Sequence, residues 1–293
     1  MSFELDDVTW IQRDFGLDRR LIKALSKLSI IYPTLVQSKT IPLALAGKDI
    51  LVRAKTGSGK TIAFVIPILH KLLTSSQLEN TKCLILAPTK ELCKQICKTV
   101  QDLCYYCKEV ITWYALSDDA TAIQQYHLKN KPHIIITTPT RIVQHIKSKS
   151  IDVSHVETLI IDEADLILSY GYSEDIQFIS TKLPKIVQGI LMSATLSPEL
   201  DKFKKIVLNN PAILKLEETK SSGKLLQFYL EISESDKFLV LYVFIKLGLL
   251  QVGFYGFSEN ARLTLFLSRA KVLFSSMMSI SVTVSSYSSS NSL

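Results

Sequence analysis

The sequence predicts an α/β fold in which a parallel β-sheet is flanked by helices on both faces. Short apolar runs alternate with helical stretches along most of the chain, which is typical of repeated βα units. These runs are close to continuously apolar, as strands buried on both faces of a sheet are. With 293 residues, 47% hydrophobic and 21% charged, the chain can also bury a sizeable core. The runs are DILVRA, KCLILAP, EVITWYAL, HIIITT, TLIID, QGILMSAT and PAILKL.

Two helices are expected before the first of these runs. Apolar residues recur at helical spacing within residues 17–28, and Asp18 stands where an N-cap would. Pro33 and Thr34 then end this helix and begin another, which closes at Gly47. A helical pair therefore leads into the first strand.

Composition divides the chain into five parts. Residues 1–29 are the helical lead-in, and residues 30–217 are the α/β domain. The polar stretch at 218–224 is typical of a linker. Residues 225–274 resemble one strand and one helix of an incomplete second domain. No fold is expected for residues 275–293, which are rich in serine and carry no charge.

Charge and cysteine content restrict the class of protein. The net charge of +7 favours a polyanionic partner, although a basic soluble surface would explain it equally well. Four of the five cysteines, Cys93, Cys97, Cys104 and Cys107, lie close together without the paired spacing of a zinc ribbon. No secretory signal opens the chain, so we expect reduced thiols in an intracellular protein. The apolar stretch around Lys246 is shorter than the ~20 residues that a bilayer requires, and no membrane partner is expected.

The stretch AKTGSGKT indicates a phosphate-binding loop. It lies between an apolar strand and a helix, where Gly57 and Gly59 allow backbone N–H groups to converge on phosphate oxygens. Lys60 would reach the β- and γ-phosphates, and Thr61 would place its hydroxyl on Mg²⁺. Ala54 occupies the first glycine position of the usual pattern, so the loop alone is also compatible with a simple turn before a helix. The predicted ATP-binding residues of the loop are Thr56, Gly57, Ser58, Gly59, Lys60 and Thr61.

A second motif, which is acidic, supports the interpretation of a phosphate-binding loop. TLIIDEAD places Asp162 and Glu163 at the end of an apolar strand. Asp162 could hold the water shell of Mg²⁺ there, and Glu163 could polarise an attacking water. The two motifs together predict a nucleoside triphosphatase site.

These residues resemble the DEAD-box family of ATP-dependent RNA helicases. The resemblance rests on DEAD at residues 162–165 and on SAT, from Ser193 to Thr195. It implies a RecA-like P-loop domain that uses ATP and Mg²⁺ and no other small-molecule substrate. It also implies that Gln37 reads the edge of the adenine base, and that Ser193 and Thr195 couple the nucleotide state to strand separation.

Two further motifs resemble the RNA-backbone motifs of the family. PTKEL carries Lys90 where arginine is usual, and TPTR carries Thr140 where glycine is usual. By this resemblance the chain binds single-stranded RNA or a short duplex through sequence-independent phosphate contacts. The residues implied are Pro88, Thr89, Lys90, Thr138, Pro139 and Arg141.

Departures from the family pattern point to one branch. Trp10 and Phe15 are both offset from the aromatic that stacks on adenine, and Ser29 and Ile30 replace a usual glycine and aromatic. YALSDDATAI stands where the family often carries a double glycine. Together with TPTR, this resembles the nucleolar branch that serves large ribosomal subunit assembly. The branch implies a nuclear and nucleolar location and contact with pre-ribosomal particles.

The region after residue 250 leaves two functions open. By the resemblance, a second RecA-like domain supplies arginines to the γ-phosphate, which can be worth roughly 10³ to 10⁵ in turnover. Later motifs of that domain are not recognisable here, so we expect this chain to bind ATP, hydrolyse it poorly and not unwind RNA. The alternative to an enzyme is a non-hydrolysing ATP- and RNA-binding module. A P-loop kinase or transporter ATPase would not explain Gln37 or the two RNA motifs.

Overall fold

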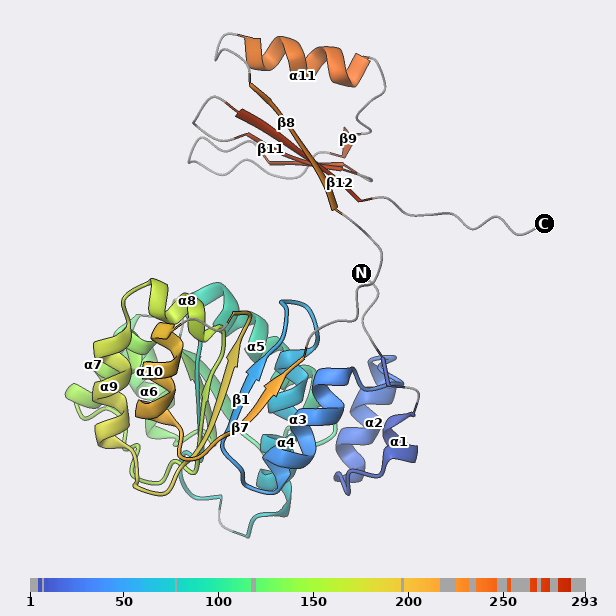
Figure 1. Cartoon of the computed structure of the whole chain (residues 1–293). Helices are drawn as coiled ribbons and strands as arrows, with labels where there is room; N and C mark the ends of the chain where they lie inside the picture. The colour runs from blue at the N-terminus through green and yellow to red at the C-terminus, as the bar shows by residue number, and fades with distance from the viewer. Residues whose placement is uncertain are drawn as a thin grey trace. The chain divides into compact units, whose positions relative to one another are not determined.

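A computed structural model of the chain (Figure 1) divides it into two compact units, Met1–Glu217 and Glu218–Leu293. The structure describes residues 5–6, 8–76, 78–116, 120–195, 198–216, 225–231, 236–246, 252–253, 264–267, 270–274 and 279–285.

The first unit is built on a seven-stranded sheet in the order β3-β4-β2-β5-β6-β1-β7. All its paired strands run parallel, and β1 lies between β6 and β7. A parallel sheet flanked by helices is the fold class that the apolar runs predicted. The strands are β1 (Ile50–Arg53), β2 (Cys83–Leu86), β3 (Trp113–Leu116), β4 (Ile134–Thr137), β5 (Thr158–Ile161), β6 (Gln188–Ser193) and β7 (Ala212–Lys215).

Ten helices of the described part surround this sheet in the first unit (Figure 1). Thr34 caps α3 through its side chain and Asp18 caps α2, as predicted from the sequence. The short α1 was not predicted. The helices are α1 (Trp10–Arg13), α2 (Arg19–Lys27), α3 (Leu35–Leu45), α4 (Lys60–Thr74), α5 (Lys90–Leu103), α6 (Thr121–Lys129), α7 (Pro139–Lys147), α8 (Ala164–Ser169), α9 (Ser173–Lys182) and α10 (Pro198–Val207).

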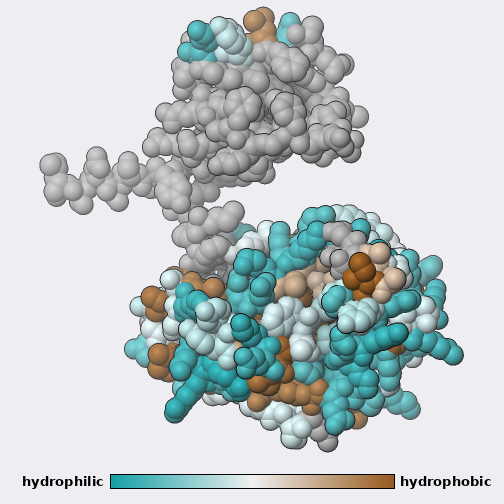
Figure 2. All heavy atoms as spheres, turned by 180° about the vertical axis from the view of Figure 1, so that it is seen from behind, coloured by the Kyte–Doolittle hydropathy of each residue, from teal (hydrophilic) through white to brown (hydrophobic). Residues whose placement is uncertain are grey.

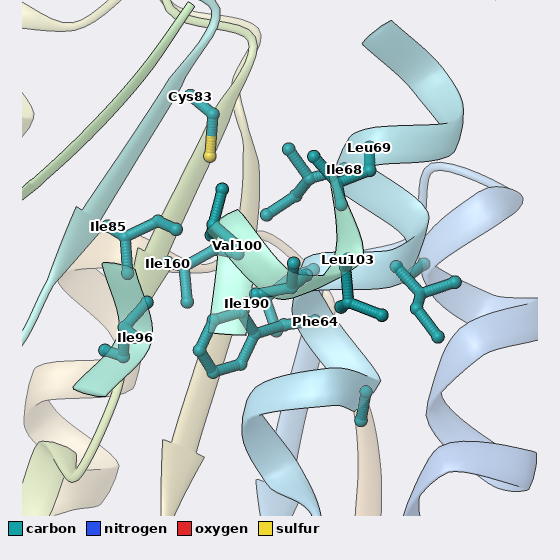
Figure 3. Close-up of a cluster of buried hydrophobic side chains, with 14 of the residues drawn as sticks. Phe64, Ile68, Leu69, Cys83, Ile85, Ile96, Val100, Leu103, Ile160 and Ile190 are labelled. Atoms are coloured by element: carbon teal, nitrogen blue, oxygen red, sulfur yellow. The ribbon is translucent and has the colours of Figure 1, made fainter. Parts of the chain in front are cut away.

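Neighbouring residues of one strand contribute to different cores, one on each face of the sheet. In β2, Ile85 joins the cluster formed with α2 to α5, whereas Leu84 and Leu86 join the cluster formed with α6 to α10. Figure 3 shows part of the first cluster, where Phe64 of α4 and Val100 of α5 lie among side chains of the strands. Because both faces are covered, the central strands β2 and β5 are buried along their whole length, whereas the edge strand β7 alternates half-buried and exposed residues.

The surface of the first unit is mainly polar. Figure 2 shows hydrophilic side chains over most of its visible face, with hydrophobic side chains in small separate groups. Within the described residues, no helix has the length and apolar character needed to cross a membrane.

The second unit contains the predicted strand and helix, β8 (Leu225–Glu231) and α11 (Lys237–Lys246), together with further strands. The strands of this unit form an antiparallel sheet in the order β8-β12-β11-β10-β9. The sequence prediction gave no fold to residues 275–293, yet β12 lies within them. In SISVTVS, isoleucine and valine alternate with serine or threonine, which is the period-two pattern of a strand. The prediction instead relied on the high serine content of this segment. The added strands are β9 (Val252–Gly253), β10 (Thr264–Leu267), β11 (Ala270–Phe274) and β12 (Ser279–Ser285).

Candidate active site

The motifs found in the sequence gather at the carboxyl edge of the parallel sheet. The loop 54–61 follows β1, Ser193 ends β6 and Asp162 follows β5, and these three strands are neighbours in the order β5-β6-β1. The segments expected to contact RNA follow β2 and β4, which are the next strands on the same side. Ligands of open α/β sheets bind at this edge.

The loop after β1 has the backbone conformation that its glycines allow. Gly57 has φ 81° and Gly59 has φ 91°, both in the left-handed region. A Cβ atom on Gly59 would meet Gln37 Nε2 at 2.5 Å and Thr34 Oγ1 at 3.1 Å. Glycine is therefore required at this position both for the dihedral angle and for the space.

Lys60, the first residue of α4, is buried against the acidic motif. Its side chain is 5% exposed, and Nζ lies 3.1 Å from Glu163 Oε1. Apart from this ion pair, Nζ has no hydrogen-bond partner among the described residues. Burying an ammonium in this way is costly unless a further acceptor binds it. The group is therefore suited to an anionic ligand at the start of the helix.

The acidic motif carries unfavourable features of its own. Burial raises the pKa of Asp162 to about 6, although Lys60 opposes this shift. Glu163 adopts a left-handed conformation with φ 48° and ψ 53°, which is rare for a residue other than glycine. Conformations of this kind cluster at functional sites because the surrounding structure must hold them in place.

Hydrogen bonds connect the ends of β1, β5 and β6. Thr195 donates to Asp165 Oδ2 from its backbone nitrogen at 3.2 Å and from Oγ1 at 3.0 Å. Ser193 Oγ donates to the Thr195 carbonyl at 2.8 Å, and the Ser193 carbonyl accepts from Ala54 N–H at 3.0 Å. Asp165 was not selected from the sequence, although it stands in the quoted DEAD motif. It ties this motif to SAT, and Ser193 ties SAT to the phosphate-binding loop.

Gln37 uses both ends of its amide within the chain. Nε2 donates to the Gly59 carbonyl at 3.1 Å, and Oε1 accepts from Thr34 N–H at 2.8 Å. The side chain is 2% exposed. The structure thus places Gln37 against the phosphate-binding loop, and the expectation that it reads adenine stays a prediction.

A cavity of about 380 Å³ opens next to Gln37. Leu5, Thr34 and Ile62 contribute to it, with Gly57 and Gly59 at the phosphate-binding loop. The aromatic residue that lines the cavity is Tyr32, 41% exposed, which the sequence did not single out. Trp10 and Phe15 do not line it, and their rings pack together with centroids 5.7 Å apart.

The first predicted RNA segment begins α5. Thr89 caps this helix by accepting from Leu92 N–H at 3.2 Å. Pro88 is buried and Lys90 is exposed.

The second predicted RNA segment begins α7. Pro139 is buried at the first turn of the helix, Thr138 precedes it, and Arg141 is half-buried. Thr140, which stands in the usual glycine position, donates to Asp175 Oδ2 at 2.6 Å. Both segments thus begin helices at the same edge of the sheet.

The architecture and these motifs are those of RNA helicases that act with ATP, and the comparison with known families agrees. Residues 34–203 match the DEAD/DEAH box helicase family, so the chain belongs to that family. It is 44% identical over 257 residues to a probable ATP-dependent RNA helicase ddx56 of Dictyostelium discoideum, covering 86% of this chain and 38% of that protein. It is 42% identical over 243 residues to the ATP-dependent RNA helicase dbp9 of Schizosaccharomyces pombe, covering 81% of this chain and 41% of that protein. The chain therefore spans about two-fifths of the length of these relatives.

Solved structures show the same fold. A DEAD box protein from the hyperthermophile Methanococcus jannaschii superposes with a TM-score of 0.65 at 24% identity, covering 85% of this chain and 66% of that one. The S. cerevisiae dbp5 chain in complex with gle1 gives a TM-score of 0.65 at 24% identity, covering 86% of this chain and 61% of that one. The RecA-like fold implied by the sequence motifs is thereby confirmed.

Proposed function

We propose that this chain is the ATP-binding domain of an ATP-dependent RNA helicase and binds ATP with Mg²⁺ at the edge formed by β1, β5 and β6. The observation that carries the proposal is the buried Lys60 ammonium, which lies at the start of α4 without a hydrogen-bond partner among the described residues. The left-handed Gly57 and Gly59 beside it leave room for phosphate oxygens to approach the backbone. These residues fit a nucleoside triphosphate.

Mg²⁺ fits the same site through few protein ligands. Asp162 and the hydroxyl of Thr61 offer oxygen atoms, while the described residues contain no cluster of three or more histidine, cysteine or acidic side chains able to hold a metal by themselves. Mg²⁺ commonly keeps several waters and takes its remaining ligands from substrate phosphates. When bound, ATP would supply the γ-phosphoryl group, and Mg²⁺ would neutralise charge on the phosphate oxygens.

Nucleotide binding changes the partner of Lys60. The 3.1 Å ion pair with Glu163 is replaced by contact with phosphate oxygens, which releases the Glu163 carboxylate. Glu163 would then accept a proton from the water that attacks the γ-phosphorus, while the bond from this phosphorus to the β–γ bridging oxygen breaks and ADP leaves. The bonds from Thr195 to Asp165 fix the position of SAT relative to this carboxylate, so the two motifs move together.

RNA binds along the ends of β2 and β4 in this proposal. Thr89, Lys90, Thr138 and Arg141 offer hydroxyl and cationic groups to phosphate oxygens at the N-termini of α5 and α7. Contacts of this kind position a backbone without reading its sequence. Pro88 and Pro139 are buried and set the direction in which each segment leaves its strand.

Full turnover requires a second RecA-like domain in this proposal, since by family resemblance that domain supplies the arginines. This chain therefore binds ATP and RNA, hydrolyses ATP slowly and does not separate strands. We further propose a nuclear and nucleolar location for the full-length protein, on pre-ribosomal particles, and the resemblance to the nucleolar branch supports this.

Titration of the purified chain with a fluorescent ATP analogue tests the proposal. Lys60→Ala removes the phosphate contact and should weaken binding at least tenfold, because a charge-assisted contact is lost. Lys39→Ala removes the same charge from an exposed position of α3 and is the matched control. Equal affinities of Lys60→Ala and the parent chain would contradict the site.

Competition with unlabelled ATP and GTP, and turnover with single-stranded RNA, complete the test. ATP should compete better than GTP, and phosphate release should stay slow with and without RNA. Fast RNA-stimulated release would show that this chain is a complete enzyme and would overturn the need for a second RecA-like domain. Binding of ATP and RNA with no detectable phosphate release would favour the alternative, a non-hydrolysing ATP- and RNA-binding module.

A further inference from the structure

Cys104 and Cys107 form a C-x-x-C pair in the turn that ends α5. Cys104 is the C-cap of this helix, and Cys107 N–H donates to the Cys104 carbonyl at 2.8 Å. A hydrogen bond between these positions closes a four-residue turn whose first and last Cα atoms lie within about 7 Å. Disulfides join residues whose Cα atoms are about 4.4–6.8 Å apart. The backbone therefore already holds the two cysteines about as close as a disulfide requires.

The two thiols also contact each other. Cys104 is fully buried, Cys107 is 3% exposed, and their side chains share a hydrogen bond. This hydrogen bond lowers the pKa of Cys107 and raises the pKa of Cys104. Burial and the charge of Asp18 oppose the shift of the Cys107 pKa, whereas the positive charge of Arg20 in α2 adds to it. Cys107 is thus the sulfur that ionises first, and Cys104 keeps its proton.

The other three cysteines lack this arrangement. Burial raises the pKa of Cys83 and Cys97, and it raises the pKa of Cys93 to about 12. Cys93 and Cys97 are four residues apart within α5, so the sequence has one C-x-x-C pair rather than the two of a zinc ribbon. Among the described residues, no group of three or more histidine, cysteine or acidic side chains could hold a metal ion. The pair therefore fits redox chemistry better than a closed metal site.

The turn with the two cysteines lies at the protein surface. Tyr105 and Tyr106, which stand between them, are 52% and 45% exposed. The backbone bonds that follow are local, because the Cys107 carbonyl accepts from Val110 N–H at 3.0 Å and from Ile111 N–H at 3.1 Å. Segments held by local bonds open at a lower free energy than the strands of a core. A small hydroperoxide can therefore reach the Cys107 sulfur when this turn opens, while the sheet stays folded.

We propose that Cys104 and Cys107 are an oxidation site, at which a hydroperoxide converts the dithiol into a reversible intramolecular disulfide. The site does not depend on the proposed ATP site. α5 begins with the predicted RNA segment, and Cys104 follows its 14 residues, about 20 Å farther along the helix axis. Oxidation therefore changes the chain at a place that is distinct from the nucleotide and RNA motifs.

Oxidation proceeds in two displacements at sulfur. The Cys107 thiolate attacks one oxygen of hydrogen peroxide and the O–O bond breaks, which leaves a sulfenic acid on Cys107. The departing hydroxide takes up the proton that Cys107 lost and leaves as water. The Cys104 sulfur then attacks the Cys107 sulfur, and the S–H proton of Cys104 joins the leaving hydroxide as a second water. Two thiols are oxidised to one disulfide while one peroxide is reduced to two waters.

Peptide mapping of the full chain tests the proposal without any variant. The reduced chain is treated with hydrogen peroxide, unfolded in the presence of a thiol-alkylating reagent and digested with trypsin. Cleavage after Lys98 and Lys108 leaves both cysteines of the pair in the peptide 99–108, whereas Cys83, Cys93 and Cys97 fall in the peptides 83–90, 91–94 and 95–98. Peptide 99–108 should lose both alkyl groups and be lighter by two hydrogen atoms than its reduced form. The other three peptides should stay alkylated, and equal loss of label in them would overturn the proposal.

Serine variants separate the roles of the two sulfurs. Cys104→Ser removes the resolving thiol, so Cys107 should stop at the sulfenic acid and be trapped by dimedone. Cys107→Ser removes the sulfur that ionises first, so oxidation of peptide 99–108 should slow at least about tenfold. Cys93→Ser makes the same change at a buried cysteine of the same helix and is the matched control, with unchanged disulfide formation. Oxidation of Cys107→Ser at the rate of the parent chain would contradict the assignment of Cys107 as the nucleophile.

Reduction distinguishes a disulfide from irreversible oxidation. Dithiothreitol added after the peroxide should restore both alkyl groups to peptide 99–108, because thiol–disulfide exchange reverses a disulfide but not a sulfinic acid. A peptide that stays unlabelled and heavier by two oxygen atoms would show that Cys107 is overoxidised rather than paired, and would overturn the reversible site.

Discussion

The two ends of the parallel strands differ in how their polar groups are paired. At the amino end, Asp49 accepts from Gly189 N–H at 2.9 Å and from Asn209 N–H at 2.6 Å. The Gln188 amide nitrogen donates to the Ala44 and Lys48 carbonyls, and its oxygen accepts from Lys71 of α4. Every one of these bonds joins segments that are distant in sequence, so this end fastens β1, β6 and β7 together.

The carboxyl end of the same strands carries unsatisfied groups. Lys60 Nζ has no hydrogen-bond partner among the described residues, the pKa of Asp162 is raised by burial, and Glu163 is left-handed. Each feature lowers the stability of the chain, and the nucleotide and cation of the proposed function would relieve the two buried charges. The amino edge of the sheet thus favours stability, whereas the carboxyl edge has the features expected of the proposed binding site.

Removal of the Asp49 carboxylate should produce the largest loss of stability. Asp49→Ala leaves two backbone N–H groups without their acceptor, and we expect about 3 kcal/mol of destabilisation. Urea denaturation measures the loss, and nucleotide affinity of the folded protein should change less than about twofold. Asp152→Ala, which removes an exposed carboxylate whose contacts with Ser154 and His155 are local in sequence, is the control. A strong effect on nucleotide affinity would show that the two edges are not independent.

Neutralisation of Asp162 should increase the stability of the chain rather than lower it. Its pKa of about 6 in the folded chain lies above the ordinary value of 3.8, so the folded state binds more protons than the unfolded state between these values. Stability from this group is complete below pH 4 and is lost as the pH rises through about 6. Asp162→Asn should therefore stabilise the nucleotide-free chain at pH 7 by about 2 kcal/mol and flatten this part of the pH profile. Thermal unfolding in a metal chelator at several pH values measures both.

The contact between the two site motifs should contribute less. Asp165→Asn keeps the size of the side chain and replaces a charged acceptor of two Thr195 donors, so about 1 kcal/mol should be lost. Thr195→Val removes one of these donors and should lose less than Asp165→Asn. Urea denaturation of the two variants and of the combined variant measures the coupling, and strictly additive losses would contradict the shared contact.

Substitution of Glu163 should have the smallest effect on stability. Glu163→Gln keeps the shape, the left-handed backbone and an amide oxygen that faces Lys60, whose charge is still compensated by Asp162, so the free energy of unfolding should change by less than about 1 kcal/mol. Nucleotide binding should persist while any phosphate release stops, because the group that accepts the proton is lost. Rapid-quench measurement of phosphate release on the nucleotide-bound variant distinguishes binding from turnover. Retained release would show that another residue accepts the proton.

Helix caps, strands and the conformation of the phosphate-binding loop could be predicted from residues that are close in sequence. Asp18 and Thr34 cap their helices, and each apolar run became a strand, because caps and hydrophobic period depend on residues a few positions apart. Gly57 and Gly59 adopt the left-handed angles that their place between a strand and a helix required. The DEAD/DEAH box family could be predicted from the same local patterns.

Contacts between these motifs, in contrast, depend on the tertiary structure. The ion pair of Lys60 with Glu163 and the hydrogen bond of Thr195 to Asp165 join residues that the order of strands brings together. The hydrophobic periodicity of single elements does not predict such long-range contacts. Strand order depends on how whole βα units pack, because each unit must bury a full face of the sheet.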